Sequence, residues 1–252
     1  TSAGTSGIIT NDGTITGIDG TIGIYGTHKV VLGNSSSTTV GDSGVAVYSS
    51  TGDVTINQGA KVQLIKGGTG TTSADNATGL FIDNSVGTAS NVTVDVYNLV
   101  QGGLGKKSYG YFFKGVNTLT YTNTNGSSPI TLDDDSIFVY SDATAGSLAN
   151  AEDLTSVGNG VIGVYQKGGS ITNTGTLDFI AGTKNTALYT ENGTATNQAA
   201  GTINVGTSNF GMVTTGGSLV NDGNINITAN KGTGMYSSSS NAITNNAFIT
   251  TA

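Results

Sequence analysis

A unit that recurs along the last third of the chain constrains the fold more than any other feature. Between residues 163 and 250, a small and an aliphatic residue lead into an aromatic residue or valine. A polar turn follows, and an aliphatic residue or alanine then stands two positions before an asparagine. These asparagines are Asn173, Asn197, Asn221 and Asn245, and the pattern recurs with a period of about 24 residues. Such a period is typical of a solenoid, in which each unit buries its apolar face only against its neighbours.

The same pattern extends back to the start of the chain. The complete series of asparagines is Asn11, Asn34, Asn57, Asn91, Asn123, Asn150, Asn173, Asn197, Asn221 and Asn245. Its period is about 24 residues at both ends and widens to roughly 34 residues in front of Asn91 and roughly 32 residues in front of Asn123. The pattern therefore predicts about ten coils of roughly 23–24 residues with loop insertions, in a single unit covering residues 1–252.

Within a unit, apolar residues alternate with polar ones, as in Ile203 and Val205 or in Ile225 and Ile227. A period of two indicates strands with one buried face. Glycine-rich pairs separate the strands, and the chain contains 40 Gly and one Pro. Three short strands in each repeat unit predict an all-β right-handed parallel β-helix. Disorder is the competing interpretation of so much Gly, Ser and Thr, but it requires no periodicity.

Two repeated side chains receive a structural interpretation. One asparagine per coil can hydrogen-bond its own turn and the amides of neighbouring coils, as in cross-β ladders, so we favour this role over ligand binding. Aromatic residues recur as well, and we expect them to stack in the core, although a surface row that stacks on sugars is the alternative. These aromatic residues are Tyr25, Tyr48, Phe113, Tyr140, Tyr165, Tyr189 and Tyr236.

The two wide spacings predict insertions near residues 66–78 and 97–108, and a smaller insertion is expected near 124–129. The first two follow the same strand of adjacent units, so we expect them side by side on one face. Insertions in repeat proteins often form the binding side. Lys106, Lys107 and Tyr109 would place cations and an aromatic ring on an acidic surface, which makes them the predicted binding residues. A loop without any partner is the alternative, since insertions cost little.

Composition argues against several classes of function. The chain has no Cys, a net charge of −7 and, by inspection, no Arg, which disfavours nucleic acid as a partner. No apolar run is long enough to cross a membrane as a helix, so we expect no membrane insertion of this segment. Asp133, Asp134 and Asp135 could bind a cation, but a solvated turn is our interpretation. His28 is the single histidine and has no assignable catalytic partner, so we predict no catalytic residues, metal or cofactor.

The segments GSITNTGTL and SLVNDGNINI and the recurring Gly-aliphatic-Tyr triplet resemble the passenger repeats of type V autotransporters, and especially the large surface adhesins of fusobacteria. The resemblance covers most of the chain and is weakest between residues 66 and 130. It implies a β-helical stalk exposed at the bacterial surface or outer membrane, in a fragment of a longer secreted protein. The family's signal peptide and translocating barrel have no counterpart in these residues.

These observations favour a non-enzymatic, secreted adhesin segment that attaches to host cells or other bacteria. Its partner would be a surface protein or a glycan, with a role in virulence. One alternative is a polysaccharide-degrading β-helix, which requires carboxylates at catalytic separation in a groove. The other alternative is a structural spacer between an adhesive tip and a membrane barrel.

Overall fold

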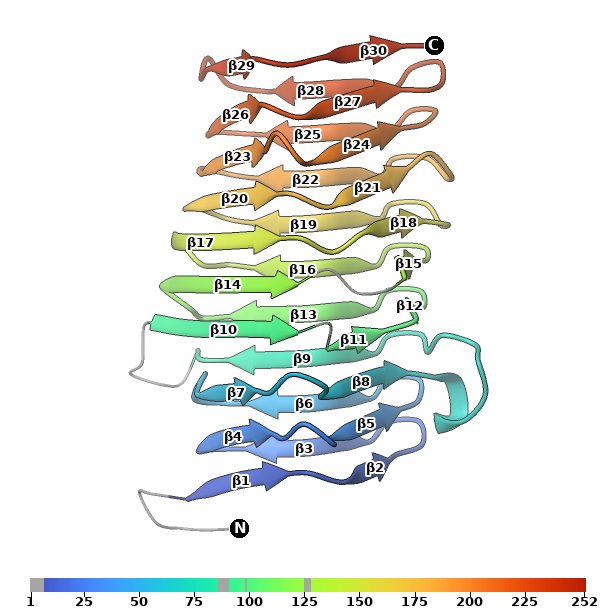
Figure 1. Cartoon of the computed structure of the whole chain (residues 1–252), viewed down its shortest axis with the longest axis vertical. Coiled ribbons are helices and arrows are strands. Elements are labelled where there is room, and N and C mark those ends of the chain that lie inside the picture. The colour runs from blue at the N-terminus through green and yellow to red at the C-terminus, as the bar shows by residue number, and fades with distance from the viewer. Residues whose placement is uncertain (1–6, 86–90, 98, 125–127) are drawn as a thin grey trace.

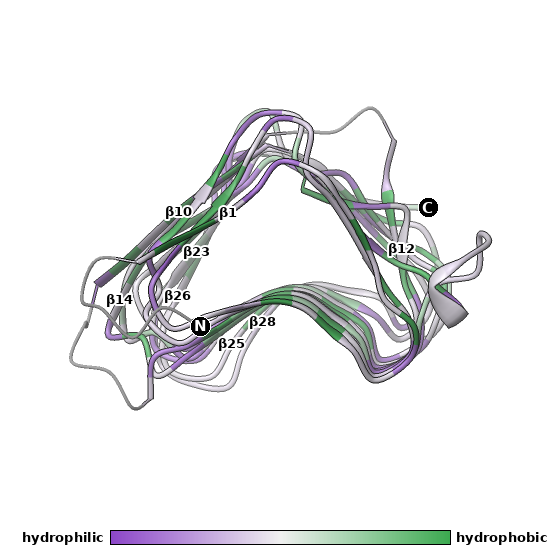
Figure 2. Ribbon diagram, turned by 90° about the horizontal axis from the view of Figure 1, so that it is seen from below, coloured by the Kyte–Doolittle hydropathy of each residue, from purple (hydrophilic) through white to green (hydrophobic). Residues whose placement is uncertain are grey.

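The chain forms a three-sided rod of stacked coils (Figures 1 and 2). The computed structural model describes residues 7–85, 91–97, 99–124 and 128–252. In these residues the secondary structure consists of strands, apart from one 3₁₀ turn, η1 (Lys66–Gly68). The main strands pair in parallel with the coils before and after them, and the chain rises as a right-handed parallel β-helix (Figure 1). The predicted fold class is thus confirmed.

Each coil contributes strands to three faces. The first face carries a three-stranded and a seven-stranded sheet. Its strands are β1 (Ile8–Asn11), β4 (Lys29–Leu32), β7 (Val54–Ile56), β10 (Asn91–Tyr97), β14 (Thr118–Thr124), β17 (Ala145–Asn150), β20 (Ser170–Asn173), β23 (Thr194–Asn197), β26 (Ser218–Asn221) and β29 (Ile243–Asn245).

The second face carries a four-stranded and a seven-stranded sheet. Its strands are β2 (Thr14–Thr16), β5 (Ser37–Val40), β8 (Lys61–Leu64), β11 (Val100–Gln101), β12 (Gly103–Leu104), β15 (Ile130–Leu132), β18 (Leu154–Ser156), β21 (Thr176–Phe179), β24 (Thr202–Val205), β27 (Asn224–Ile227) and β30 (Ile249–Thr251).

The third face is a continuous nine-stranded sheet that bends near its middle (Figure 2). Its strands are β3 (Ile22–Gly26), β6 (Val45–Ser49), β9 (Thr78–Asp83), β13 (Tyr109–Lys114), β16 (Ile137–Ser141), β19 (Ile162–Gln166), β22 (Thr186–Thr190), β25 (Phe210–Thr214) and β28 (Thr233–Ser237).

The core runs along the axis of the rod and is filled by alternate residues of the strands. In β14, Leu119 and Tyr121 are fully buried, whereas Thr120 and Thr122 face solvent. In-register stacking repeats this arrangement, so Leu148, Ile171 and Ala195 follow one another in the interior. Each coil therefore buries its apolar side chains against the coils above and below, as the sequence period requires.

The predicted asparagine ladder exists in the upper part of the rod. Nδ2 of Asn150 donates to Oδ1 of Asn173 at 2.9 Å, and Nδ2 of Asn173 donates to Oδ1 of Asn197 at 3.0 Å. The ladder consists of Asn123, Asn150, Asn173, Asn197, Asn221 and Asn245. Second donors bind backbone carbonyls, for example that of Gly175. The structural interpretation of these asparagines is confirmed.

The lower part of the predicted series is wrong. Asn11 pairs with Leu32 instead of Asn34, and Leu32 pairs in turn with Ile56 instead of Asn57. Asn91 pairs with Thr118 at the beginning of its strand, while Val96 occupies the ladder position beside Asn123. Asn11, Leu32 and Ile56 share one register position, and Val96 stands beside Asn123, so Asn34, Asn57 and Asn91 imitate the pattern from nearby positions without taking part in the ladder.

The three predicted insertions differ in the structure. Residues 66–73 form a projecting loop between β8 and β9 (Figure 1), closed by the hydrogen bond from the Lys66 amide to the Thr72 carbonyl. Residues 97–108 are not a comparable loop, because β11 and β12 continue the second face and bury Leu99, Val100 and Leu104. Of the segment near 124–129, residues 125–127 lie outside the described residues.

Candidate functional site

The outer surface of the third face differs from the other two. On the first and second faces, the outward side chains are mostly Thr, Ser and Asn, such as Thr172, Thr196 and Asn204. The third face instead presents two outward columns of large side chains. One column contains Tyr109, Ile137, Ile162 and Phe210 with threonines between or beside them, and the other is almost entirely aromatic. This asymmetry makes the third face the candidate binding surface.

The second of these columns, called the aromatic column below, contains one residue from each strand of the sheet. Its members, in register order, are Tyr25, Tyr48, Phe81, Phe112, Tyr140, Tyr165, Tyr189, Val213 and Tyr236. Tyr25 and Tyr236 are exposed, Val213 is buried, and the others are half-buried. Because successive coils hold equivalent positions one strand spacing apart, the rings form a continuous row from Tyr25 to Tyr189, which Val213 separates from Tyr236.

Most rings in the column stack in parallel. The ring centroids of Tyr140 and Tyr165 are 4.8 Å apart with an interplanar angle of 2°, and those of Phe112 and Tyr140 are 4.8 Å apart at 11°. Phe81 turns its ring nearly perpendicular to those of Tyr48 and Phe112. Such pairs contribute about 0.5–1.5 kcal/mol each beyond the area they bury, so the column stabilises the sheet as well as shaping its surface.

The prediction that the aromatic residues stack in the core is therefore wrong for the six tyrosines and holds for Phe113, which is fully buried against Tyr121. The next residue in each strand faces inward, and it is commonly a Ser or Thr whose hydroxyl caps the following turn. Thr190, for example, follows Tyr189, and its Oγ1 accepts a hydrogen bond from the Gly193 amide at 3.0 Å. Phe113 occupies this inward position in its strand, because it pairs with Ser141 and is fully buried. Phe112 occupies the outward position of the aromatic column.

The stacking geometry also bears on the alternative of a sugar-stacking row. Within the run from Phe112 to Tyr189, each ring covers part of its neighbour's face. Solvent then contacts mainly ring edges and hydroxyl groups, whereas a sugar that stacks on an aromatic side chain needs a free face. Burial and the hydrogen bond from its hydroxyl to Glu191 raise the pKa of Tyr165 well above its usual value near 10. The column thus offers a neutral, apolar edge with hydroxyl groups.

The predicted binding residues lie at the corner where the second face turns into the third. Tyr109 joins the surface of the third face, with its ring centroid 4.8 Å from that of Phe112 and 6.3 Å from that of Tyr140. Lys106 and Lys107 are exposed in the preceding turn, where Lys107 adopts a left-handed φ of 55°. The structure thus separates the three residues into an aromatic part and a cationic part.

Residues 66–78 and 97–108 do lie side by side at this corner, as the sequence predicts. The Asn76 amide donates to the Lys106 carbonyl at 2.7 Å, and the Lys106 amide donates to Oδ1 of Asp75 at 2.8 Å. The Ser108 hydroxyl bridges the segments through the Ala74 carbonyl and the Ala77 amide. The register of the two coils is fixed by these contacts.

A carboxylate ladder runs along the same corner. Asp19 accepts the amide of Asp42, Asp42 accepts that of Asp75, and Asp134 accepts that of Asn159, at 2.8–2.9 Å. Lysine side chains neutralise part of its charge. Nζ of Lys66 lies 3.4 Å from Asp42 and 3.6 Å from Asp75, and Nζ of Lys106 lies 3.0 Å from Asp134.

Asp134 has a defined place in this ladder. The Asn159 amide and then the Lys106 ammonium lower the pKa of its carboxyl, while the Asp134 carboxylate raises the pKa of Lys106. Asp133 caps its own turn by accepting the Asp134 amide, and Asp135 occupies the left-handed position of the turn. The cation that contacts this cluster is therefore the side chain of Lys106. Among the described residues, no three His, Cys, Asp or Glu side chains are grouped as metal ligands.

A pocket of about 290 Å³, lined by both polar and apolar side chains, lies between the projecting loop and the second face. Its lining residues are Lys66, Thr72, Ser73, Asp75, Leu104, Lys106, Thr131, Asp133 and Val157. The two predicted insertions and β15 thus meet around one hollow. Lys106 is the one predicted binding residue that lines it.

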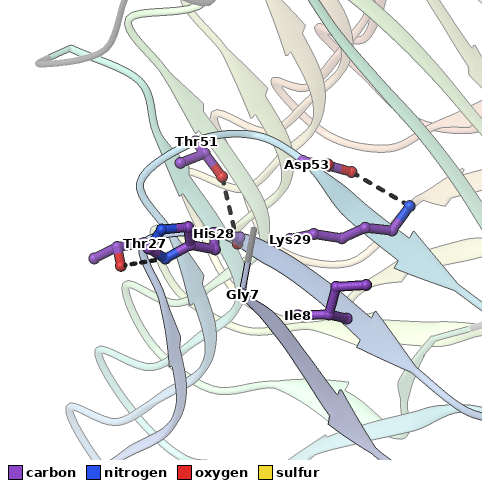
Figure 3. A pocket seen from close by; sticks show the side chains of 7 residues that line it. All are labelled: Gly7, Ile8, Thr27, His28, Lys29, Thr51 and Asp53. Carbon is purple, nitrogen blue, oxygen red and sulfur yellow. Dashed lines mark hydrogen bonds and ion pairs between the residues drawn. The ribbon is translucent and has the colours of Figure 1, made fainter. Parts of the chain in front are cut away.

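Another pocket lies at the lower end of the rod, around His28 (Figure 3). Its charged groups contact one another, since Nζ of Lys29 lies 3.8 Å from Asp53. Nδ1 of His28 shares a hydrogen bond with the hydroxyl of Thr27 at 3.0 Å, and the Thr51 hydroxyl donates to the His28 carbonyl. The interactions drawn in Figure 3 thus join the polar residues of this pocket to one another, and the pocket carries no functional assignment.

Sequence reasoning missed two features of the surface and core. Phe81 and Phe112 belong to the aromatic column. Each stands two residues after a glycine, as Tyr165 does after Gly163, and this shared position could have revealed them. Asn185 and Asn209 form a second buried ladder, in which the Asn185 amide donates to Oδ1 of Asn209 at 3.0 Å. Their spacing of 24 residues was the available signal.

Comparisons of the chain with protein-family models, with curated proteins and with solved structures find no match. Within the described residues, none of the helical structure is long and apolar enough to span a bilayer.

Proposed function

We propose that this chain is a surface-exposed, non-enzymatic segment of a bacterial adhesin, and that it binds a protein on a host cell or another bacterium through the third face. The observation that carries the proposal is the outward aromatic column on a rod whose other faces are rich in Thr, Ser and Asn. Protein interfaces are enriched in Tyr and Phe, and contiguous exposed apolar patches commonly mark interaction sites.

The geometry favours a protein partner over a glycan on this face. Ring edges and the flanking side chains of Ile137 and Ile162 offer apolar contact, and tyrosine hydroxyls offer hydrogen bonds at the rim. The row is held rigidly by in-register strands, so little conformational entropy is lost when a partner covers it. The resemblance to autotransporter passengers adds the expected location at the bacterial surface or outer membrane.

The test compares the binding of chain-coated beads to cultured epithelial cells and to other bacteria. Replacing Tyr140, Tyr165 and Tyr189 by Ser removes the centre of the aromatic column, and we expect at least a tenfold loss of binding. A matched control replaces Thr172, Thr194 and Thr196 by Ala on the first face and should bind like the wild type.

Because removing three stacked rings also weakens the sheet, a second variant keeps them all. Ile162→Lys places a charge beside the column, at an outward position, and should also reduce binding while unfolding at the wild-type temperature. Binding that survives in both variants, with folding verified, would overturn the assignment of the third face. A wild-type chain that binds no cell type would overturn the adhesin proposal itself.

The spacer alternative is favoured by one specific observation, the unbroken nine-stranded sheet that makes the rod continuous. A spacer predicts that the full protein adheres equally well with the third-face substitutions. For the polysaccharide-degrading alternative, the described residues provide no comparable support, because Asp19, Asp42, Asp75 and Asp134 are engaged in the corner ladder.

A further inference from the structure

The pocket between the projecting loop and the second face has a construction unlike the rest of the surface. The loop is tied back by the Lys66 amide and by an isolated antiparallel bridge between Ile65 and Ser73. Gly103 lies underneath, where a Cβ atom would come within 2.3 Å of Oγ1 of Thr131 and 2.7 Å of Oγ of Ser73. Glycine at this position thus leaves room for two hydroxyl groups that line the pocket.

The lining combines hydrogen-bond donors with hydrogen-bond acceptors. Lys66 and Lys106 bring ammonium groups whose side chains are about half exposed, at 52% and 55%. Asp75 and Asp133 bring carboxylate acceptors, and the hydroxyls of Thr131 and Ser73 can serve as either. Val157, an exposed apolar side chain, supplies a nonpolar wall. A ligand that carries several hydroxyl groups around a nonpolar ring matches this set.

Charge around the pocket selects against an acidic ligand. Four carboxylates, those of Asp42, Asp75, Asp133 and Asp134, surround the two ammonium groups of Lys66 and Lys106. Each lysine is already paired with carboxylates, and the chain as a whole carries a net charge of −7. An anionic ligand would compete with these pairs, whereas a neutral polyol can accept from the lysines and donate to the carboxylates without breaking them.

We propose that this pocket binds one residue of a neutral glycan. A volume of about 290 Å³ lies just below the range of roughly 300–1,000 Å³ found for small-molecule sites, and so limits the ligand to about a single sugar ring. The site is independent of the third face, since it lies on the outer side of the second face and the adjoining corner. It adds glycan recognition to a rod whose proposed protein contact is elsewhere.

The experiment is an NMR titration of the isotopically labelled chain with methyl β-glucoside, methyl β-galactoside and N-acetylglucosamine, and with galacturonate for comparison. At least one neutral sugar should shift the amide signals of Ser73, Lys106 and Thr131, with a millimolar dissociation constant typical of so small a ligand. Galacturonate should bind at least five times more weakly than that sugar.

Two substitutions and one control localise the binding. Thr131→Tyr fills the pocket from β15, and Lys66→Met removes a donor from its rim; each should weaken binding at least tenfold. Thr155→Tyr makes the same change at the paired outward position of the next coil, outside the lining, and should bind like the wild type. Thermal unfolding verifies that all three variants are folded.

Absence of shifts at the pocket amides with every neutral sugar would overturn the proposal, as would unchanged affinity in the folded Thr131→Tyr variant. These outcomes can be distinguished from a failure of the proposed protein contact on the third face. Cell binding that is lost in the aromatic-column variant and retained in Thr131→Tyr supports the protein contact, whatever the titration shows.

Discussion

Polar side chains that point inward join neighbouring coils of this rod at the level of single residues. Asn173, Asn197 and Asn221 are fully buried, yet both hydrogens of Asn173 and Asn197 have acceptors within the structure. Buried amides are tolerated because each coil supplies the acceptor that the next requires. The consequence is that a change at one position affects two coils.

Asn221→Leu should therefore destabilise the rod. Oδ1 of Asn221 accepts from Asn197 at 2.9 Å, and its Nδ2 donates to Asn245 at 2.8 Å. Leucine leaves the buried Asn197 amide without this acceptor, at a cost of about 1–3 kcal/mol, whereas the exposed Asn245 can bind water instead. Chemical unfolding of the variant measures this loss. Thr196→Leu, at an outward position, is the control, and an Asn221→Leu variant as stable as that control would show that the ladder contributes nothing.

Gln166 offers a prediction of the opposite sign. It is fully buried, and neither Oε1 nor Nε2 has a hydrogen-bond partner in the structure. Its register neighbours are Ser141 and Thr190, and the Thr190 hydroxyl caps its turn. In the Gln166→Thr variant, the threonine hydroxyl should accept a hydrogen bond from the Gly169 amide in the same way. After subtraction of the cost of the cavity left by the smaller side chain, the free energy of unfolding should rise by about 1 kcal/mol. A lower stability of Gln166→Thr than of the wild type would refute this account.

At the scale of strands and turns, the repeat predicts the stacking but not the direction of every side chain. In each strand of the third face, the second residue has no register partner in the neighbouring strand. Ile137 thus pairs with Ile162, and Val139 pairs with Val164. Two successive residues, Phe138 and Val139, are both buried. Strict alternation is interrupted there, and a change of one residue in parity moves a side chain to the other face. This is why the sequence pattern alone places Tyr140 in the core.

The loop prediction failed in part for a related reason. Counting residues between asparagines locates extra length, but it does not show whether that length becomes a loop or widens a coil. Residues 66–73 project, whereas Val100 and Leu104 are drawn into the second face by pairing with Val62 and Leu132. The pocket near Thr131 depends on this difference and on contacts between coils, so its complete lining was beyond the sequence.

The facing strands β13 and β14 lead to a pH prediction. Tyr111 and Tyr121 pack against each other inside the rod with centroids 5.3 Å apart, and burial raises the pKa of both well above 10. The unfolded chain loses these protons near pH 10, but the folded chain keeps them. Stability from this source is therefore complete below pH 10 and declines as the pH rises above it.

Urea unfolding at pH 8 and at about pH 11 measures this decline. Tyr121→Phe removes one of the two groups and should give a shallower fall in the free energy of unfolding over the same interval. Equal falls in the wild type and in the variant would mean that Tyr121 titrates normally in the folded protein.

At the scale of the whole molecule, the regular spacing of the coils predicts the distance between residues in different coils. Thr122 and Thr244 occupy the same outward column of the first face, five coils apart, through Ala149, Thr172, Thr196 and Val220. Spin labels attached to cysteines at Thr122 and Thr244 should therefore be separated by about 24 Å, or five strand spacings. The absence of native cysteines makes the labelling specific. A broad distance distribution centred well beyond this value would be inconsistent with a stacked rod.

The central claim is that the aromatic column faces solvent along a continuous sheet, and single cysteines test it most directly. Tyr140→Cys and Tyr165→Cys place a thiol in the column, whereas Val139→Cys and Val164→Cys place it one residue earlier, where the side chain is fully buried. Under native conditions we predict rapid maleimide labelling at positions 140 and 165 and protection at 139 and 164. Protection at 140 and 165 in folded protein would contradict the claim, because it would return the aromatic residues to the core.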